Sequence, residues 1–503
     1  MRSPTAPAAA SATALLFGRF DSESIEGFTP RAFFRIARFP TDQTTQPSAA
    51  FRRLKTATAG AYPSRAIAIT RPADWKRSLS VLQSTAVGLG EAARPLRERR
   101  FRLLWLGRVS SSIGDAIVPV ALTFAVLSIH GSATALGGVL AAFTVARVVF
   151  TLAGGVIADR FSRRTIMVAC DVVRALLQAF IAVMLLTHEM TLAAFIGCEA
   201  LFGMASAFFG PAADGLVPQT IGTDELQAAN ALLGMSRNTL NVFGPALSGL
   251  LVGLAGAGYV FAIDAGSFVL SAVFVAQLDV DAPARAPFRS FAAELRDGLR
   301  EVVSRAWVRT PMIGFAITNV MFASFLVLGP LVFLAHVSHP KAFWGLVSAC
   351  GSVGAIVGAF ASVKLAPRHP LYGAFVGSTL IAVPIAALAE PLPWEAIAVA
   401  WGFGMGSIAL ANTWWETSLQ RLIPEHVYAR VRSYDILVSF VFMPVGMLAF
   451  GPIADAVGFE RTLFAAAAIA AATNIAVAFT PAVRAVESPV PGTPEGYRVP
   501  VQT

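Results

Sequence analysis

Residues 154–164 read GGVIADRFSRR, and this short basic segment separates two long apolar runs, 133–158 and 166–186. Each run has about the 20 residues that an α-helix needs to cross a bilayer. Short loops rich in arginine are retained on the cytoplasmic side of a membrane. The segment therefore predicts a hairpin of two membrane-spanning helices whose arginine-rich turn is cytoplasmic.

The composition of the whole chain is that of an integral membrane protein. Of its 503 residues 55% are hydrophobic and only 14% are charged, with a mean hydropathy of +0.65. Soluble domains carry nearer a quarter of charged residues. The net charge of +9 comes from short turns and an N-terminal segment. It therefore indicates cytoplasmic turns that face anionic lipid rather than a nucleic-acid-binding surface.

Twelve apolar runs follow one another along the chain, and they predict an all-α integral membrane protein with twelve transmembrane helices. We expect two six-helix bundles, at 99–280 and 311–482. Basic residues are concentrated in the turns predicted to be cytoplasmic, so we expect a multi-pass protein of a bacterial plasma membrane with both termini in the cytoplasm. The runs are 103–129, 133–158, 166–186, 192–213, 231–255, 259–278, 312–335, 342–363, 371–388, 394–415, 434–457 and 463–479.

Three segments lie outside the predicted bundles. Residues 1–98 are rich in Ala, Ser, Thr, Pro and Arg and poor in acids, which is typical of a disordered tail or of a wrongly extended reading frame. Residues 281–310 are expected to be a cytoplasmic linker. Within it, 288–308 has the spacing of a basic amphipathic helix that lies in the membrane interface. Residues 483–503 are expected to be a cytoplasmic tail.

The two predicted bundles are related by a weak internal repeat. The sequence LVPQ at 216–219 has a counterpart, LIPE, at 422–425, and Pro119 has a counterpart in Pro330. These offsets of about 200 residues are those expected of two parallel six-helix repeats. The basic hairpin is reduced in the second half to VKLAPR at 363–368, so the halves are not equivalent.

Several motifs resemble those of a known family. GVIADRFSRR at 155–164 is similar to the loop 2–3 motif of the major facilitator superfamily, with Ser162 where glycine is usual. NVFGPALSG at 241–249 is similar to the antiporter motif of its exporters, with a serine at one glycine position. The wider sequence, including SIGD at 112–115 and ACDVVRA at 169–175, resembles the macrolide and enterobactin exporter branch over roughly residues 98–480.

The resemblance implies the major facilitator fold and a secondary active exporter that works by alternating access. The expected activity is proton-coupled antiport of a small amphipathic compound such as an antibiotic, siderophore or other secondary metabolite. Its partners would be this substrate, protons and membrane lipids, with the chain acting as a monomer and no cofactor. The antiporter motif would be carried by Gly244, Pro245 and Gly249 in helix 5.

The resemblance also implies a charged cytoplasmic gating motif, or latch. In the resembled family such a latch holds the outward-facing state by meeting the inner end of helix 11, where Arg430, Arg432 and Asp435 are the expected partners. The latch residues would be Gly155, Asp159, Arg160, Arg163, Arg164, Asp171 and Arg174.

Ionisable residues within apolar runs are costly and therefore are candidates for proton coupling. Asp115 in helix 1 and Glu199 in helix 4 are rival proton carriers, with Arg147 in helix 2 as the cation that pairs with one of them. The alternative for each is a structural polar contact. Asp264 is expected to be a cap or an interhelical hydrogen-bonding group, and Glu416 a solvated structural residue.

Other functional classes remain open at this point. An importer or a lipid flippase on the same fold is the nearest alternative, and a membrane sensor or scaffold is a further one. No nucleophile, metal or cofactor motif supports an enzyme. Three cysteines lie in apolar runs, so no disulfide or metal site is predicted. Aromatic candidates for a substrate wall are Phe124, Phe143, Phe208, Phe322 and Trp344.

Overall fold

The computed structural model describes residues 94–280, 299–365, 367–390 and 392–488, and every regular element within these ranges is a helix. Among these described residues, eleven helices are long and apolar enough to cross a membrane. The fifth predicted span, 231–255, forms α7 (Leu226–Leu254), which has 29 residues but is not among the eleven. Its sequence contains Arg237 and three asparagines. The predicted all-α membrane fold is confirmed.

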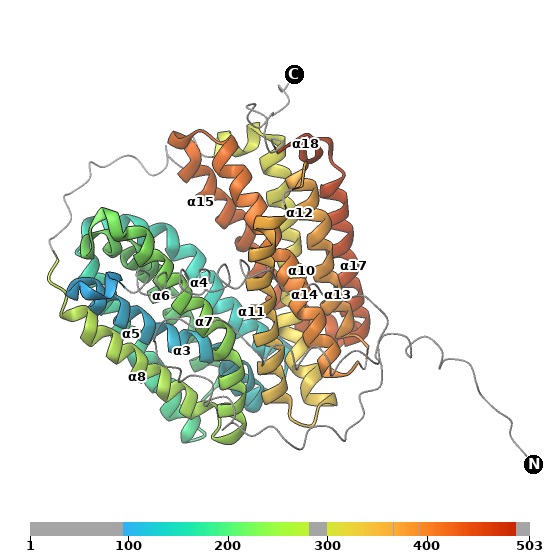
Figure 1. The fold of residues 1–503 in the computed structure, drawn as a ribbon. Coiled ribbons are helices and arrows are strands. Elements are labelled where there is room, and N and C mark those ends of the chain that lie inside the picture. The colour runs from blue at the N-terminus through green and yellow to red at the C-terminus, as the bar shows by residue number, and fades with distance from the viewer. Residues whose placement is uncertain (1–93, 281–298, 366, 391, 489–503) are drawn as a thin grey trace, which may run out of the picture. The chain divides into compact units, whose positions relative to one another are not determined.

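The helices form two groups (Figure 1). In the first bundle α3 packs against α8, α7 and α6, α4 packs against α6, and α5 packs against α8. Its helices are α3 (Arg99–His130), α4 (Ala133–Arg160), α5 (Arg163–Leu186), α6 (Leu192–Thr220), α7 and α8 (Ala257–Ala276). Short 3-10 turns, η2 (Arg94–Arg97) and η3 (Thr223–Glu225), precede α3 and α7.

In the second bundle α11 packs against α14, and α10 packs against α16 and α17. Its helices are α10 (Ala306–His336), α11 (Pro340–Lys364), α12 (Pro370–Ser378), α13 (Ala382–Ala387), α14 (Trp394–Leu422), α15 (Glu425–Val441), α16 (Met443–Val457) and α17 (Phe459–Ala478). The 3-10 turn η4 (Thr379–Ile381) joins α12 to α13, and a short helix, α18 (Pro481–Arg484), follows α17.

Two predicted spans are interrupted, and one begins early. The run at 371–388 is divided by η4, and the run at 434–457 is divided at Phe442, just before Pro444. Proline has no N–H for the helical ladder, so it favours the first turn of a new helix. α10 begins at Ala306, inside the segment predicted as linker. The predicted tails at 1–98 and 483–503 and the amphipathic helix at 288–308 lie largely outside the described residues.

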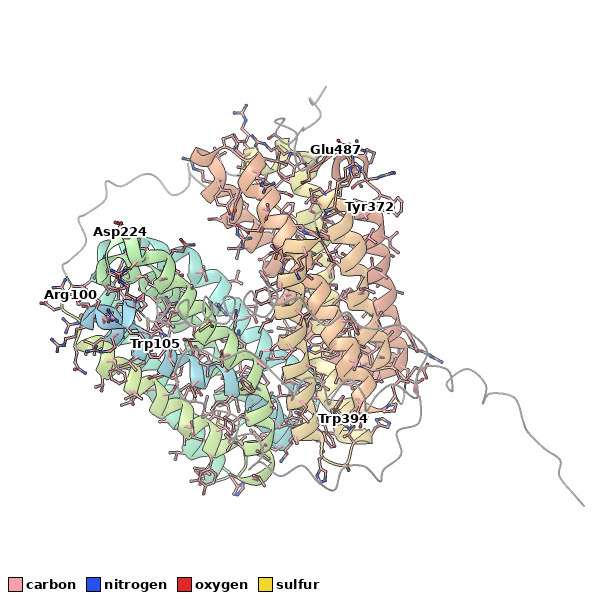
Figure 2. All side chains as sticks on the ribbon, in the orientation of Figure 1. Arg100, Trp105, Asp224, Tyr372, Trp394 and Glu487 are labelled. Atoms are coloured by element: carbon pink, nitrogen blue, oxygen red, sulfur yellow. The ribbon has the colours of Figure 1, made fainter. Side chains whose placement is uncertain are left out.

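Each bundle has a basic end and an opposite end. The basic end carries the α4–α5 turn in the first bundle and the α14–α15 turn in the second. The opposite end carries the α3–α4 and α16–α17 turns, where Gly131 and Gly458 have positive φ. In the second bundle Tyr372 and Glu487 lie at the basic end and Trp394 lies at the opposite end (Figure 2).

The two bundles contact each other mainly through α7 with α11 and through α4 with α16. A Cβ on Gly345 would overlap the carbonyl oxygen of Pro245, and a Cβ on Gly137 would overlap that of Met447. Gly345, Pro245 and Gly137 lie in the halves of their helices nearer the opposite end, and Met447 lies in α16, the part of the divided span that leads to that end. These two glycine contacts therefore bring the bundles together backbone against backbone at that end.

Toward the basic end the side chains of α4 are no longer covered by the second bundle. From Ala133 to Ala141 α4 buries most of its side chains, whereas Val145, Arg147, Val149 and Thr151 are exposed. A helix in contact with the second bundle along its whole length would not show this change. The bundles therefore separate toward the basic end.

A larger residue at a glycine contact is expected to open the opposite end. In Gly345→Leu the side chain has no space beside Pro245, and overpacking of this kind costs about 1–3 kcal/mol unless the helices move apart. Spin labels on Leu254 and His339, at the adjoining ends of α7 and α11, should report a longer distance than in the wild-type protein. Gly266→Leu is the matched control, because nothing lies within 4 Å of a Cβ there. Equal distances in both variants would contradict the assigned contact.

Candidate functional site

One face of α3 is not covered by its own bundle. Asp115 and Pro119 are exposed on this face, although α3 is otherwise mostly buried. The positive charges that act on the Asp115 carboxylate are Arg174, Arg147 and Arg237, in that order. The predicted proton carrier is thus exposed on the surface of α3, and cations on α5, α4 and α7 act on its charge.

Arg147 is exposed on α4, with its guanidinium carbon 5.8 Å from the centroid of the Phe143 ring. Its charge acts on Asp115, which makes this acid the better electrostatic partner of the two that the sequence suggested. Arg237 on α7 acts on the same carboxylate, and it was not among the predicted residues. The pattern that marks it is an arginine inside an apolar run, as for Arg147.

Glu199 has a different environment. Its side chain is 2% exposed on α6, and Oε1 has no hydrogen-bond partner among the described residues. An ionised carboxylate in such surroundings carries a large desolvation cost. The two predicted rivals therefore differ in access, since Asp115 faces solvent and Glu199 does not.

Asp171 and Arg174 form a buried ion pair on α5. Arg174 Nη2 lies 2.5 Å from Asp171 Oδ1, and Ser271 of α8 donates a hydrogen bond of 2.7 Å to Asp171 Oδ2. The guanidinium lies 4.0 Å from the ring centroid of Phe209 and 4.3 Å from that of Phe268. Exposures of 0% and 2% place this pair inside the first bundle. The structure therefore places both residues inside the first bundle, and their part in a cytoplasmic latch stays a prediction.

The two described arginines of the basic turn, Arg163 and Arg164, bind backbone carbonyls of α6 and α8. Arg163 donates a hydrogen bond of 2.5 Å to the carbonyl of Gly215 in α6. Arg164 donates to the carbonyl of Ala276, the last residue of α8. A cation at a helix C-terminus is stabilised by the helix dipole and by the unpaired carbonyls there. The side chains of Gly155, Asp159 and Arg160 lie outside the described residues.

The helix 5 motif contacts both bundles. A Cβ on Gly244 would lie 2.5 Å from that of Ala116 on α3, and Ser248 Oγ donates to the carbonyl of Ile117. On another face of α7, Gly249 lies against the backbone of Lys341 at the start of α11. Pro245 does not interrupt the helix. The motif therefore joins α3 to the contact that holds the opposite end together.

A cavity of about 810 Å³ lies in the second bundle between α10, α14 and α15. It extends from Met405, near the middle of α14, to Gln420, near the basic end of that helix. The aromatic and polar side chains of its wall include Phe315, Phe322, Trp415, Phe440, Asn319 and Asn412. A mixture of this kind suits an amphipathic molecule.

Charged residues complete the cavity wall at its basic end. Arg432 Nε lies 3.1 Å from Glu416 Oε2, and the same guanidinium pairs with Asp435. Tyr428 donates a hydrogen bond to Glu416 Oε1. Burial, followed by this hydrogen bond, raises the pKa of the Tyr428 hydroxyl. Two carboxylates thus share one guanidinium, and the wall has an excess of one negative charge.

The cavity bears on several expectations. Glu416, expected to be a solvated structural residue, is 28% exposed, lines the cavity and pairs with Arg432. Arg432 and Asp435 bind each other in this structure, and their expected contact with the latch, which belongs to the outward-facing state, stays a prediction. Of the five predicted aromatic candidates only Phe322 lines the cavity. Phe124 and Trp344 are buried in the hydrophobic core.

Known proteins are similar to this chain over about three quarters of its length. A family model described as "Transmembrane secretion effector" matches residues 91–492. The multidrug efflux pump Tap of Mycolicibacterium fortuitum is 27% identical over 398 residues, which cover 76% of this chain and 96% of Tap.

Two solved transporters resemble the structure at low sequence identity, so they bear on the fold alone. The nucleoside transporter NupG has a TM-score of 0.62 at 11% identity, covering 75% of this chain and 98% of its own. A bacterial homologue of the human lysosomal transporter Spinster, inward-facing and unoccupied, has a TM-score of 0.58 at 16% identity, covering 77% and 97%.

Breaking the buried ion pair is expected to destabilise the first bundle. Arg174→Met leaves the Asp171 charge without its cation, and loss of one partner of a buried pair costs about 3–5 kcal/mol. The double variant Asp171→Leu/Arg174→Met removes both charges and should be more stable than Arg174→Met in thermal unfolding. Arg94→Gln removes the exposed pair with Glu225 and should cost less than about 1 kcal/mol. A double variant less stable than Arg174→Met would contradict this explanation.

Proposed function

Because the chain belongs to the transmembrane secretion effector family of the major facilitator superfamily, we propose that this membrane transporter exports small amphipathic compounds in exchange for protons. The basic end faces the cytoplasm in this proposal, and the membrane is a bacterial plasma membrane. Transport proceeds by alternating access, in which the two bundles open first at one end and then at the other.

The observation that carries the proposal is the cavity at the basic end of the second bundle. Aromatic rings and amide side chains surround about 810 Å³, a volume within the range of small-molecule sites. The two glycine contacts hold the bundles together at the opposite end, while α4 becomes exposed toward the basic end. A compound in the cytoplasm therefore has a route to the cavity, as an exporter in its loading state requires.

Export rather than import is supported by two further facts. The relative from Mycolicibacterium fortuitum is named as a multidrug efflux pump, and it is matched over 96% of its length. The helix 5 motif around Gly244 and Pro245, with Gly249, makes the close contacts that an exporter-type motif would provide.

Coupling to protons is assigned to acids of the first bundle. Asp115 is exposed on α3, and the cations Arg147 and Arg237 act on it. The Asp115 carboxylate can exchange protons with water, and each exchange changes the net charge beside Arg147 and Arg237. Glu199 is the second candidate, and because it is buried it can exchange a proton only when the bundle opens around it.

The basic turn is assigned to control of the cytoplasmic opening. Arg163 and Arg164 fix the ends of α6 and α8 in this structure. Gly155, Asp159 and Arg160 lie in the same turn in sequence. In the closed state of the basic end, we expect this turn to meet the start of α15.

The transport test uses inverted membrane vesicles with an imposed pH gradient and ethidium as the fluorescent probe, followed by a panel of amphipathic antibiotics. Wild-type vesicles should accumulate probe when the gradient is applied, and Asp115→Asn should reduce this to the level of protein-free vesicles. The substitution keeps the size of the side chain and removes its ability to carry a proton. Asp224→Asn, in the exposed turn before α7, should transport like the wild type. Full gradient-driven transport by both Asp115→Asn and Glu199→Gln would refute the assignment of the carriers.

The cavity charge should affect probe selection. Glu416→Gln removes one negative charge near Arg432 but keeps a carbonyl oxygen that can accept from Tyr428. Transport of ethidium, a cation, should fall relative to transport of a neutral probe by roughly fivefold, equivalent to about 1 kcal/mol of charge interaction in a wet cavity. Glu395→Gln, at the opposite end of α14, is the control. An unchanged ratio would show that this wall does not contact the probe.

A further inference from the structure

Asp264 is the most enclosed acid of the first bundle. It lies on α8 with 0% exposure, and its Oδ2 has no hydrogen-bond partner among the described residues. Its Oδ1 accepts one hydrogen bond, of 3.3 Å, from Ser267 Oγ. The carboxyl lies directly on Gly114 of α3, where any Cβ would overlap it. The expectation of an ordinary cap or interhelical hydrogen bond does not describe this environment.

The charges around Asp264 come from each neighbouring helix. Asp115 on α3 and Glu199 on α6 act on it as like charges, and Arg174 on α5 acts as the opposite charge. α5 also contributes Asp171, and Arg174 is bound to that residue at 2.5 Å. From α7, Arg237 acts on Asp115. The buried cation beside Asp264 is therefore already paired with another acid.

A second observation supports a polar interior rather than one isolated acid. Glu199 Oε1, Arg174 Nε and both amide atoms of Gln178 are also buried without hydrogen-bond partners among the described residues. Unsatisfied buried polar groups are rare in folded proteins, and each calls for an explanation. Here they belong to two helices, α5 and α6, whose charged residues act on Asp264.

Desolvation decides the form in which Asp264 can exist in this packing. An ionised carboxylate without a paired cation carries a penalty of several kcal/mol in a protein interior, and such groups are neutralised by a proton. Water would have to reach Asp264 for it to ionise, and the nearest exposed acid is Asp115, one residue along α3 from Gly114.

We propose that Asp264 is a second proton-binding residue of the transport cycle, which exchanges its proton through Asp115 and holds α8 against α3 only while it is protonated. The proton moves between two carboxyl oxygens, directly or through water, and no other bond changes. This proposal rests on the proposed proton-coupled function but assigns the stored proton to a residue that faces no substrate. Asp115 is then the group that connects the stored proton to solvent.

The first experiment measures the proton directly and needs no substrate. Infrared difference spectra of the purified, reconstituted protein, recorded across a pH titration, report the C=O band of a protonated carboxyl. This band should lose intensity in Asp264→Asn and should not change in Asp279→Asn, whose exposed acid follows the same helix. Full intensity in Asp264→Asn would overturn the proposal. Asp264→Ser is the second variant, because it removes the carboxyl with a smaller side chain.

The second experiment measures the consequence for packing, again without substrate. Spin labels on Leu254 and His339 should report a pH-dependent distance in the wild type, short at acidic pH and longer at alkaline pH. Asp264→Asn imitates the protonated acid and should remain short at both. A pH response equal to that of the wild type would overturn the proposal. Because neither experiment uses a transported compound, loss of vesicle transport alone would count against the proposed function and not against this proton site.

Discussion

Four consecutive residues of α3, Gly114–Ile117, determine how the first bundle is held together. Helices in a bilayer gain little from hydrophobic association, so small residues and interhelical hydrogen bonds must hold them. Ala116 meets Gly244 side by side, and the carbonyl of Ile117 accepts from Ser248. Because α7 makes its other close contact with α11, the packing of these four residues is connected directly to the contact between the bundles.

The same stretch organises the charges of the first bundle. Asp115 faces solvent, whereas Gly114 leaves room for the buried carboxyl of Asp264. The exposed acid Asp115 is thus adjacent in sequence to Gly114, the residue against which the buried acid Asp264 packs. The second bundle places two acids, Glu416 and Asp435, on a cavity wall. In the proposed transport cycle the first bundle therefore carries the protons and the second bundle carries the substrate cavity.

The sequence predicted the fold well because hydropathy and arginine placement follow from the bilayer itself. Asp115 could be found for the same reason, as a charge inside an apolar run. The burial of Asp171, Arg174 and Asp264 could not, because periodicity shows which residues share a face but not which helix covers it. The cavity beside Glu416 could not be predicted either, because the sequence does not show that α10 and α15 pack around this end of α14.

A proton on Asp264 and the contact at the opposite end are coupled through helix packing rather than through a chain of hydrogen bonds. α8 rests on α3 at Gly114, and α7 rests on α3 two residues later. If the Asp264 carboxyl ionises, water must enter between α8 and α3. This displaces α3, the helix against which α7 also packs. Since α7 meets α11 through backbone at Pro245 and Gly345, a small shift cannot be absorbed by side chains. Protonation therefore favours the state in which the opposite end is closed, and ionisation favours its opening.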